Sequence, residues 1–187
     1  MPHEIKAEDG TGLPDANSYV TLADAETYLD ATGRACAGAW SLASTDDKNS
    51  ALINATQYMD TTYRCRYLGE RAEATIDTQA LEFPRDGLFA PSGAAIASAD
   101  IPPEIANACA EFALVAIAGE IQPDPVPVDA SGRTVELLRV RVEGAVEKET
   151  RYTGGSASSG SARRTYPRAE RVLRKWLRPA SRLLLRA

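Results

Sequence analysis

The side chains best suited to binding chemistry lie near the C-terminal end of the sequence. Residues 163–187 hold nine of the 21 lysines and arginines but only one of the 26 aspartates and glutamates, Glu170, which gives this segment a formal charge of +8. The other 162 residues carry −13, and the whole chain carries −5. Guanidinium and ammonium groups bind phosphates and carboxylates. The asymmetry therefore predicts an acidic body with a basic segment that binds an anionic partner.

The basic segment also has an apolar stripe, which predicts an amphipathic helix that begins near Thr165 or Pro167 and breaks near Pro179. The residues expected to dock on a partner are Arg171, Val172, Arg174, Lys175, Trp176, Leu177 and Arg178. A flexible glycine- and serine-rich linker at 153–162 favours docking over the alternative, packing of the helix on its own domain. An acidic protein groove, a nucleic-acid backbone and a membrane surface all fit this composition.

Residue types suited to catalysis do not occur in a catalytic pattern. The single histidine, His3, lies near the N-terminus, so no Ser-His or Cys-His pair is expected in the core. The carboxylates match neither an acid and base pair nor a calcium loop. The three cysteines are far apart and are expected to be free thiols; they are Cys36, Cys65 and Cys109. We therefore expect no enzyme activity, no catalytic residue, no cofactor and no metal.

The size and composition are those of one soluble domain with an appendage. The chain has 187 residues, of which 44% are hydrophobic and 25% are charged. No apolar run is long enough to span a bilayer, and the N-terminal residues lack the pattern of a secretory signal. We therefore expect a soluble protein made in the cytoplasm, with no membrane partner.

Three helices are predicted to form the core. A capping box at Thr21 begins the first, over 22–32, and the second runs from about residue 44 to residue 64. The third begins near Pro103 and is apolar on nearly every face, which predicts a central helix. The turn-rich residues 8–18 are expected to form a loop, and 65–100 an irregular connection.

A β-hairpin is predicted after the third helix, at about 135–152. Apolar residues alternate with charged ones there, at Leu138, Val140 and Val142. The fold class is therefore mainly α: a small helical bundle of three core helices with a β-hairpin and a C-terminal docking helix. The expected division is a body at 1–152, a linker at 153–162 and a basic arm at 163–187.

Four stretches resemble a tailed-phage family, the DnaT-like single-stranded DNA-binding proteins. They are residues 8–20, 51–60, 79–85 and 101–105. The resemblance covers about residues 8–120, and Phe83 stands where the family more often has tryptophan. In helical layout the chain is also similar to the head-to-tail adaptor, or head completion, proteins of long-tailed phages.

The adaptor resemblance implies a structural role in the virion, at the neck between head and tail. The implied partners are further copies in a dodecameric ring, the portal protein, a tail-side neck or tail terminator protein, and the genomic DNA that passes through the lumen. Trp176 and Leu177 would be buried in the portal, and the hairpin would contact neighbouring subunits. An acidic body suits a lumen through which DNA slides. The alternative function is a single-stranded DNA-binding replication accessory protein.

Overall fold

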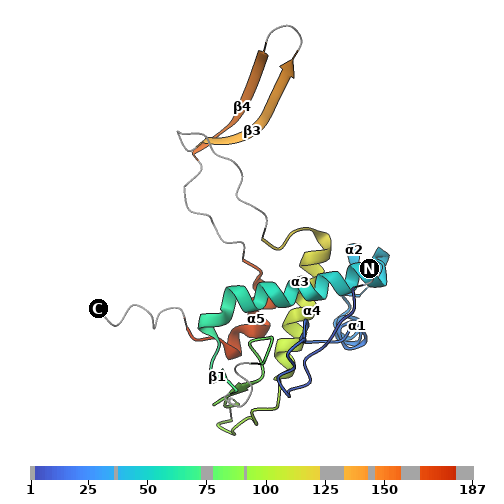
Figure 1. Ribbon diagram of the computed structural model, residues 1–187, viewed down its shortest axis with the longest axis vertical. Helices are drawn as coiled ribbons and strands as arrows, with labels where there is room; N and C mark the ends of the chain where they lie inside the picture. Colours follow the sequence, from blue (N-terminus) through green and yellow to red (C-terminus); the bar gives the residue numbers. More distant parts are fainter. Residues whose placement is uncertain are drawn as a thin grey trace, which may run out of the picture. The chain divides into compact units, whose positions relative to one another are not determined.

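The computed structural model describes residues 3–35, 38–72, 78–90, 92–122, 133–142, 146–156 and 165–179. The chain divides into two compact units, one of residues Met1–Ile121 with Thr165–Ala187 and one of Gln122–Arg164. The first unit is mainly helical with one short pair of strands, and the second contains a longer two-stranded antiparallel sheet (Figure 1). The predicted fold class, mainly α with a hairpin, is therefore confirmed.

Local capping signals place the first helices where the sequence predicts them. Helix α1 (Leu22–Ala31) begins after Thr21, whose side chain accepts the Asp24 N–H. Helix α3 (Thr45–Tyr63) begins with a full capping box, in which Ser44 and Asp47 satisfy each other's backbone N–H. The four-residue helix α2 (Ala39–Leu42), which the sequence analysis did not predict, lies between them.

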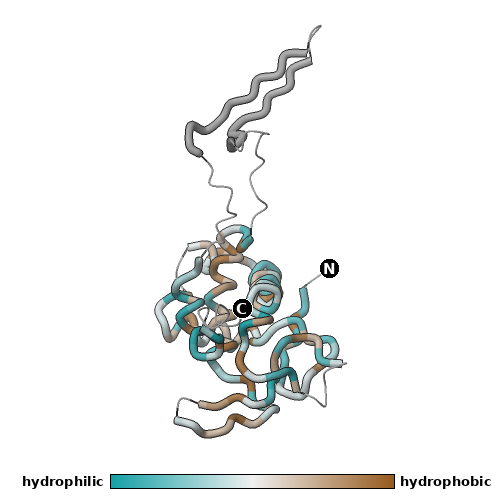
Figure 2. Tube along the Cα trace, turned by 90° about the vertical axis from the view of Figure 1, so that its left-hand side faces the viewer, coloured by the Kyte–Doolittle hydropathy of each residue, from teal (hydrophilic) through white to brown (hydrophobic). Residues whose placement is uncertain are grey.

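Helix α4 (Pro103–Ala118) is the centre of the first unit, as its apolar composition predicts. It contacts α1, α2, α3 and α5, and Figure 1 shows it crossing α3. Its fully buried side chains are Ile105, Ala108, Cys109, Ala110, Phe112 and Ala113. In Figure 2 the helices of this unit carry both hydrophobic and hydrophilic turns, as expected for helices with one buried face.

The connection between α3 and α4 is mostly irregular, as predicted. It contains the 3-10 helix η1 (Arg64–Arg66) and two short antiparallel strands, β1 (Glu70–Arg71) and β2 (Arg85–Asp86). The Phe83–Pro84 peptide bond is cis. No helix in the described part of the chain is both long and apolar enough to cross a membrane.

The predicted hairpin is present and is longer than expected. Strand β3 (Arg133–Val142) pairs with β4 (Val146–Ser156). The register places Leu138 opposite Thr150, Val140 opposite Lys148, and Val142 opposite Val146. Residues 153–156, predicted as part of the linker, belong to β4, and the rest of the predicted linker lies outside the described residues.

The C-terminal segment differs from the predicted free arm. Helix α5 (Pro167–Leu173) continues into the 3-10 helix η3 (Arg174–Trp176), and α5 packs on α4. The buried side chains of this segment are Ala169, Leu173, Trp176 and Leu177, and Val172 is half-buried. Trp176 and Leu177, which the sequence analysis expected to be buried in a portal, are buried in the chain's own core. Over residues 165–179 the alternative, packing on the same chain, is the one observed.

The core role of this segment predicts that Leu173→Ala destabilises the first unit. Leu173 is 0% exposed, so its truncation removes buried methyl groups and leaves a cavity. We expect the free energy of unfolding to fall by about 2–5 kcal/mol, measured by urea denaturation with circular dichroism. Arg171→Ala, at an exposed position of the same helix, should change it by less than about 0.5 kcal/mol. Equal stabilities of the two variants would contradict the packing described here.

Candidate functional site

Two segments that are far apart in the sequence pair with each other next to η1. The Leu68 N–H donates to the Trp176 carbonyl at 2.9 Å, and the Arg178 N–H donates to the Arg66 carbonyl at 2.6 Å. Between these bonds Tyr67 and Leu177 form an isolated antiparallel bridge. The pairing fixes the end of the C-terminal segment along the end of α3.

Both of the paired segments carry basic side chains. We call them the basic cluster: Arg64 and Arg66 from η1, and Arg171, Arg174, Lys175 and Arg178 from α5 and the residues that follow it. All are exposed except Arg66, which is partly buried. The sequence analysis named the four C-terminal members as site residues and missed the two on η1. The arginine on each side of Cys65 was a local sign of positive charge. The sequence alone did not indicate that these arginines lie next to the C-terminal segment.

The charges of the basic cluster are only partly compensated. Lys175 forms an ion pair with Glu104, and Arg64 forms one with Glu82 at 3.1 Å. The other four members make no ion pair with any residue that the structure describes; they are Arg66, Arg171, Arg174 and Arg178. The cluster is therefore a local excess of positive charge on a chain whose net charge is −5.

The groups beneath the basic cluster hold its backbone in place. The Trp176 indole N–H donates to Glu104 at 3.2 Å, and the Tyr63 hydroxyl donates to Glu170 at 3.0 Å. The Arg66 guanidinium lies 5.8 Å from the centre of the Tyr63 ring. Because these aromatic rings are buried, the surface offers guanidinium and ammonium groups rather than exposed rings. Guanidinium and ammonium groups are side chains that can bind anions.

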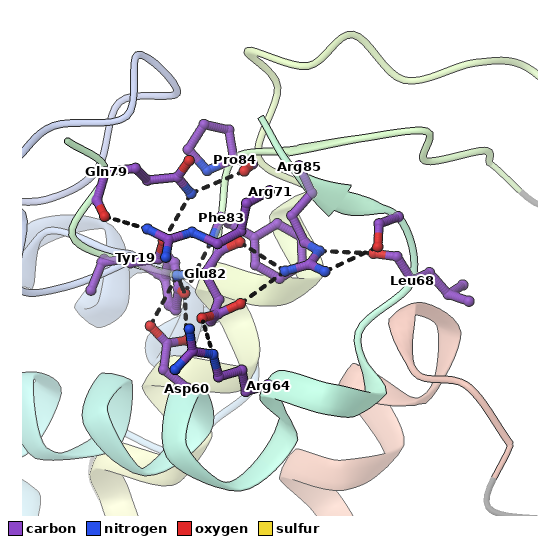
Figure 3. Close-up of polar contacts among 12 residues, drawn as sticks. Tyr19, Asp60, Arg64, Leu68, Arg71, Gln79, Glu82, Phe83, Pro84 and Arg85 are labelled. Carbon is purple, nitrogen blue, oxygen red and sulfur yellow. Dashed lines mark hydrogen bonds and ion pairs between the residues drawn. The ribbon is translucent and has the colours of Figure 1, made fainter. Parts of the chain in front are cut away.

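A buried polar network lies beside the Arg64 end of the basic cluster (Figure 3). The Tyr19 hydroxyl donates to Asp60 Oδ1 at 2.5 Å, and the Glu82 N–H donates to Asp60 Oδ2 at 3.1 Å. The same hydroxyl accepts the N–H groups of Glu82 and Phe83. Together these bonds attach the loop of residues 81–85 to α3.

Glu82 lies between two arginines in this network. One carboxylate oxygen contacts Arg64, and the other contacts Arg85 at 3.0 Å. Arg85 is itself buried and donates to the carbonyls of Leu68 and Gly69. These hydrogen bonds fix the backbone of residues 68–69, which belongs to the segment that pairs with Trp176.

Burial changes the protonation of several groups near this network. It raises the pKa of Asp60 to about 7, although the hydrogen bonds from Tyr19 and the Glu82 N–H act in the opposite direction. Burial also raises the pKa of the Cys109 thiol to about 11, so this thiol stays protonated at neutral pH. No group of three or more metal-ligating side chains occurs within the described ranges.

The raised pKa of Asp60 predicts that stability falls as the pH rises from about 4 to about 7. The unfolded carboxyl has a pKa of about 3.9, so the folded state binds more protons across this window. The decrease should be on the order of 1.4 kcal/mol for each unit of pKa difference. Urea denaturation of wild type and Asp60→Asn at several pH values measures it. An unchanged slope in Asp60→Asn would show that Asp60 is not the group responsible.

The comparisons with known proteins give one match. No curated protein and no solved structure matches the chain. The model of one protein family, described as "Putative DnaT-like ssDNA binding protein", matches residues 4–187. That match extends beyond residue 120, where the resemblance in the sequence ended, and includes the C-terminal segment of the basic cluster. The chain belongs to this DnaT-like family.

Proposed function

We propose that this protein binds single-stranded DNA through the phosphate backbone, at the basic cluster. The observation that carries the proposal is the pairing of Arg66–Leu68 with Trp176–Arg178, which brings the backbone of two segments rich in basic residues side by side. The printed description of the family, an ssDNA-binding protein, supports the same ligand. This was the alternative function in the sequence analysis.

The uncompensated arginines of the cluster supply the attraction. Each phosphate that an arginine neutralises releases a condensed counterion, so affinity falls steeply with salt. An arginine also binds a phosphate in a bidentate manner, which a lysine cannot do. The rest of the chain carries a net negative charge, which disfavours DNA binding away from the basic segment.

The ligand contacts at this site are to phosphates rather than to bases. Tyr63 and Trp176, the aromatic residues beneath the cluster, are 1% and 4% exposed, so bases cannot stack on them. Base stacking and hydrogen bonds to base edges are what give sequence preference. We therefore expect similar affinities for oligonucleotides of different sequence.

Charge reversal at two exposed arginines tests the site. Arg174→Glu and Arg178→Glu should each weaken binding to an oligo(dT) of about 20 nucleotides by about tenfold or more. Each should also reduce the slope of log K against log salt by about 1, because one phosphate contact is lost. Fluorescence anisotropy at several KCl concentrations measures both.

A matched charge reversal away from the cluster is the control. Lys6→Glu changes the net charge equally, at an exposed residue that pairs with Asp15 in the N-terminal segment. It should leave the salt dependence unchanged and lower the affinity much less. Equal losses from all three variants would indicate a general charge effect, and no binding by the wild type would refute the proposal.

A second proposal is the structural role, as a head-to-tail adaptor in a ring at the virion neck. The observation that favours it is the hairpin, whose strands of 10 and 11 residues form a two-stranded sheet with no third strand among the described residues. An isolated two-stranded sheet is marginally stable in water, so contact with a partner would stabilise it. Further copies of the chain, the portal and a tail-side protein remain its proposed partners.

The ring hypothesis predicts a self-assembled species. Native mass spectrometry of the full chain should detect an oligomer, and Val140→Asp, at the centre of β3, should shift it toward the monomer. Arg174→Glu should not change the assembly state. A chain that stays monomeric at high concentration would contradict self-assembly through the hairpin.

A further inference from the structure

We propose that a hollow at the start of α4 is the docking site for residues 182–186 of the same chain. The inference goes beyond the proposed function, and neither proposal requires the other. It depends on the shape and charge of the hollow, and on a basic, apolar segment that follows the residues lining it.

The hollow has a volume of about 620 Å³ and is surrounded by segments that are far apart in the sequence. These are the N-terminal segment at Glu8 and Asp9, the loop before α4, the first turn of α4, and the end of the C-terminal segment at Lys175 and Trp176 (Figure 1). Ligand sites in proteins typically enclose about 300–1,000 Å³. We call this feature the acidic hollow.

Hydrogen bonds and close packing fix the N-terminal side of the acidic hollow. The Glu8 carboxylate accepts three backbone N–H groups from the turn at residues 10–13, at distances of 2.8 to 3.1 Å. A Cβ added at Gly10 would lie 1.8 Å from the Ala99 carbonyl oxygen, so the turn packs directly on the loop before α4. This side of the hollow is therefore formed before any ligand binds.

Glu104 fixes the C-terminal side of the acidic hollow. Its carboxylate accepts the Trp176 indole N–H at 3.2 Å and forms an ion pair with Lys175. Trp176 is 4% exposed, so its ring is held in the core while one edge lines the hollow. The C-terminal segment thus reaches the hollow three residues before Pro179, the last residue that the structure describes.

The lining of the acidic hollow combines apolar side chains with carboxylates. Its largest apolar members are Ile96, Ile101, Pro102, Pro103 and Trp176, and its charged members are Glu8, Asp9, Asp100, Glu104 and Lys175, with a formal charge of −3. Such a surface repels phosphates, so it does not extend the proposed DNA site. It favours a ligand that is both cationic and apolar.

Two of these carboxylates remain available to a cationic ligand. Asp9 accepts hydrogen bonds only from Thr11, within its own turn, and forms no ion pair with any described residue. The Asp100 side chain has no hydrogen-bond or ion-pair partner among the residues that the structure describes. Both residues are exposed.

The end of the chain has the complementary composition. Residues 180–187 lie outside the described part of the chain, and their sequence places three leucines, 183–185, between Arg182 and Arg186. This segment contains no acidic residue. Its leucines suit the apolar lining of the hollow, and its two arginines suit the two available carboxylates.

The position of Pro179 puts this segment within reach of the acidic hollow. An extended chain spans about 3.3–3.6 Å per residue, so Leu184 can lie up to about 17 Å from Pro179. Trp176, which lines the hollow, is only three residues before Pro179. A short tether gives the segment an effective concentration on the order of millimolar, so even a weak site would be occupied.

The first test is a competition with a free peptide. The probe is a peptide of residues 180–187 with a fluorescent label at its N-terminus, and anisotropy measures its binding to the full chain. Leu184→Asp disfavours docking of the chain's own segment, because it puts a carboxylate among the leucines. The peptide should therefore bind Leu184→Asp at least about tenfold more tightly than wild type. Equal affinities, or no binding to Leu184→Asp, would overturn the inference.

A charge reversal locates the peptide site. Asp100→Lys, added to Leu184→Asp, should weaken peptide binding by about threefold to tenfold. Asp30→Lys is the matched control, because it makes the same charge change at an exposed position on α1. It should leave the affinity nearly unchanged. Equal effects of the two reversals would contradict docking in the hollow, as would equally tight binding of a control peptide whose leucines are replaced by serine.

The second test asks whether the segment docks within one chain. Ala99→Cys and Leu184→Cys are combined in a chain whose Cys36 and Cys65 are replaced by serine, and a short bismaleimide joins the two thiols. Intact mass spectrometry should find the cross-link at the mass of one chain. The control replaces Ala99→Cys with Leu42→Cys, which is 89% exposed and lies on α2; its yield should be several-fold lower. Equal yields, or a product with the mass of two chains, would overturn docking within the same chain.

Discussion

The first unit depends on one non-local interaction, the packing of residues 167–178 against α3 and α4. Leu173 and Trp176 fill space that the N-terminal part of the chain leaves open, and the Tyr67–Leu177 bridge fixes the chain direction. Hydrophobic burial supplies the free energy, and the two backbone hydrogen bonds determine which residues become neighbours. The basic cluster is a product of that packing, because its two halves meet only when the core is complete.

Local patterns predicted most of the helices, because their determinants lie within a few residues. Thr21 and Ser44 mark the starts of α1 and α3, and the composition of α4 indicates its central position. The packing partner of the C-terminal apolar stripe was harder to predict. An amphipathic helix needs an apolar surface to pack on, and its own sequence does not say which surface that is. The glycine-rich end of β4 resembled a linker because pairing with Arg133, rather than propensity, makes it a strand.

The candidate site could be predicted only in part for the same reason. Arg174 and Arg178 stand out as part of a charge reversal, which composition detects. Arg66 joins them through a backbone hydrogen bond to a residue more than 100 positions away, and Asp60 meets Glu82 across a loop. Neither contact produces a periodic pattern in the sequence, because residues that pair in the tertiary structure have no fixed separation along the chain.

The first unit is discontinuous, with residues 122–164 inserted between two parts of one core. The entropic cost of closing such a loop grows only with the logarithm of its length, so doubling the length of the loop adds about 0.6 kcal/mol to that cost. The inserted unit can therefore lengthen, shorten or change sequence among relatives with little effect on the helical core. During translation, however, the core cannot form until Trp176 has been synthesised and has left the ribosome. The inserted unit is therefore synthesised in full while the first unit is still incomplete.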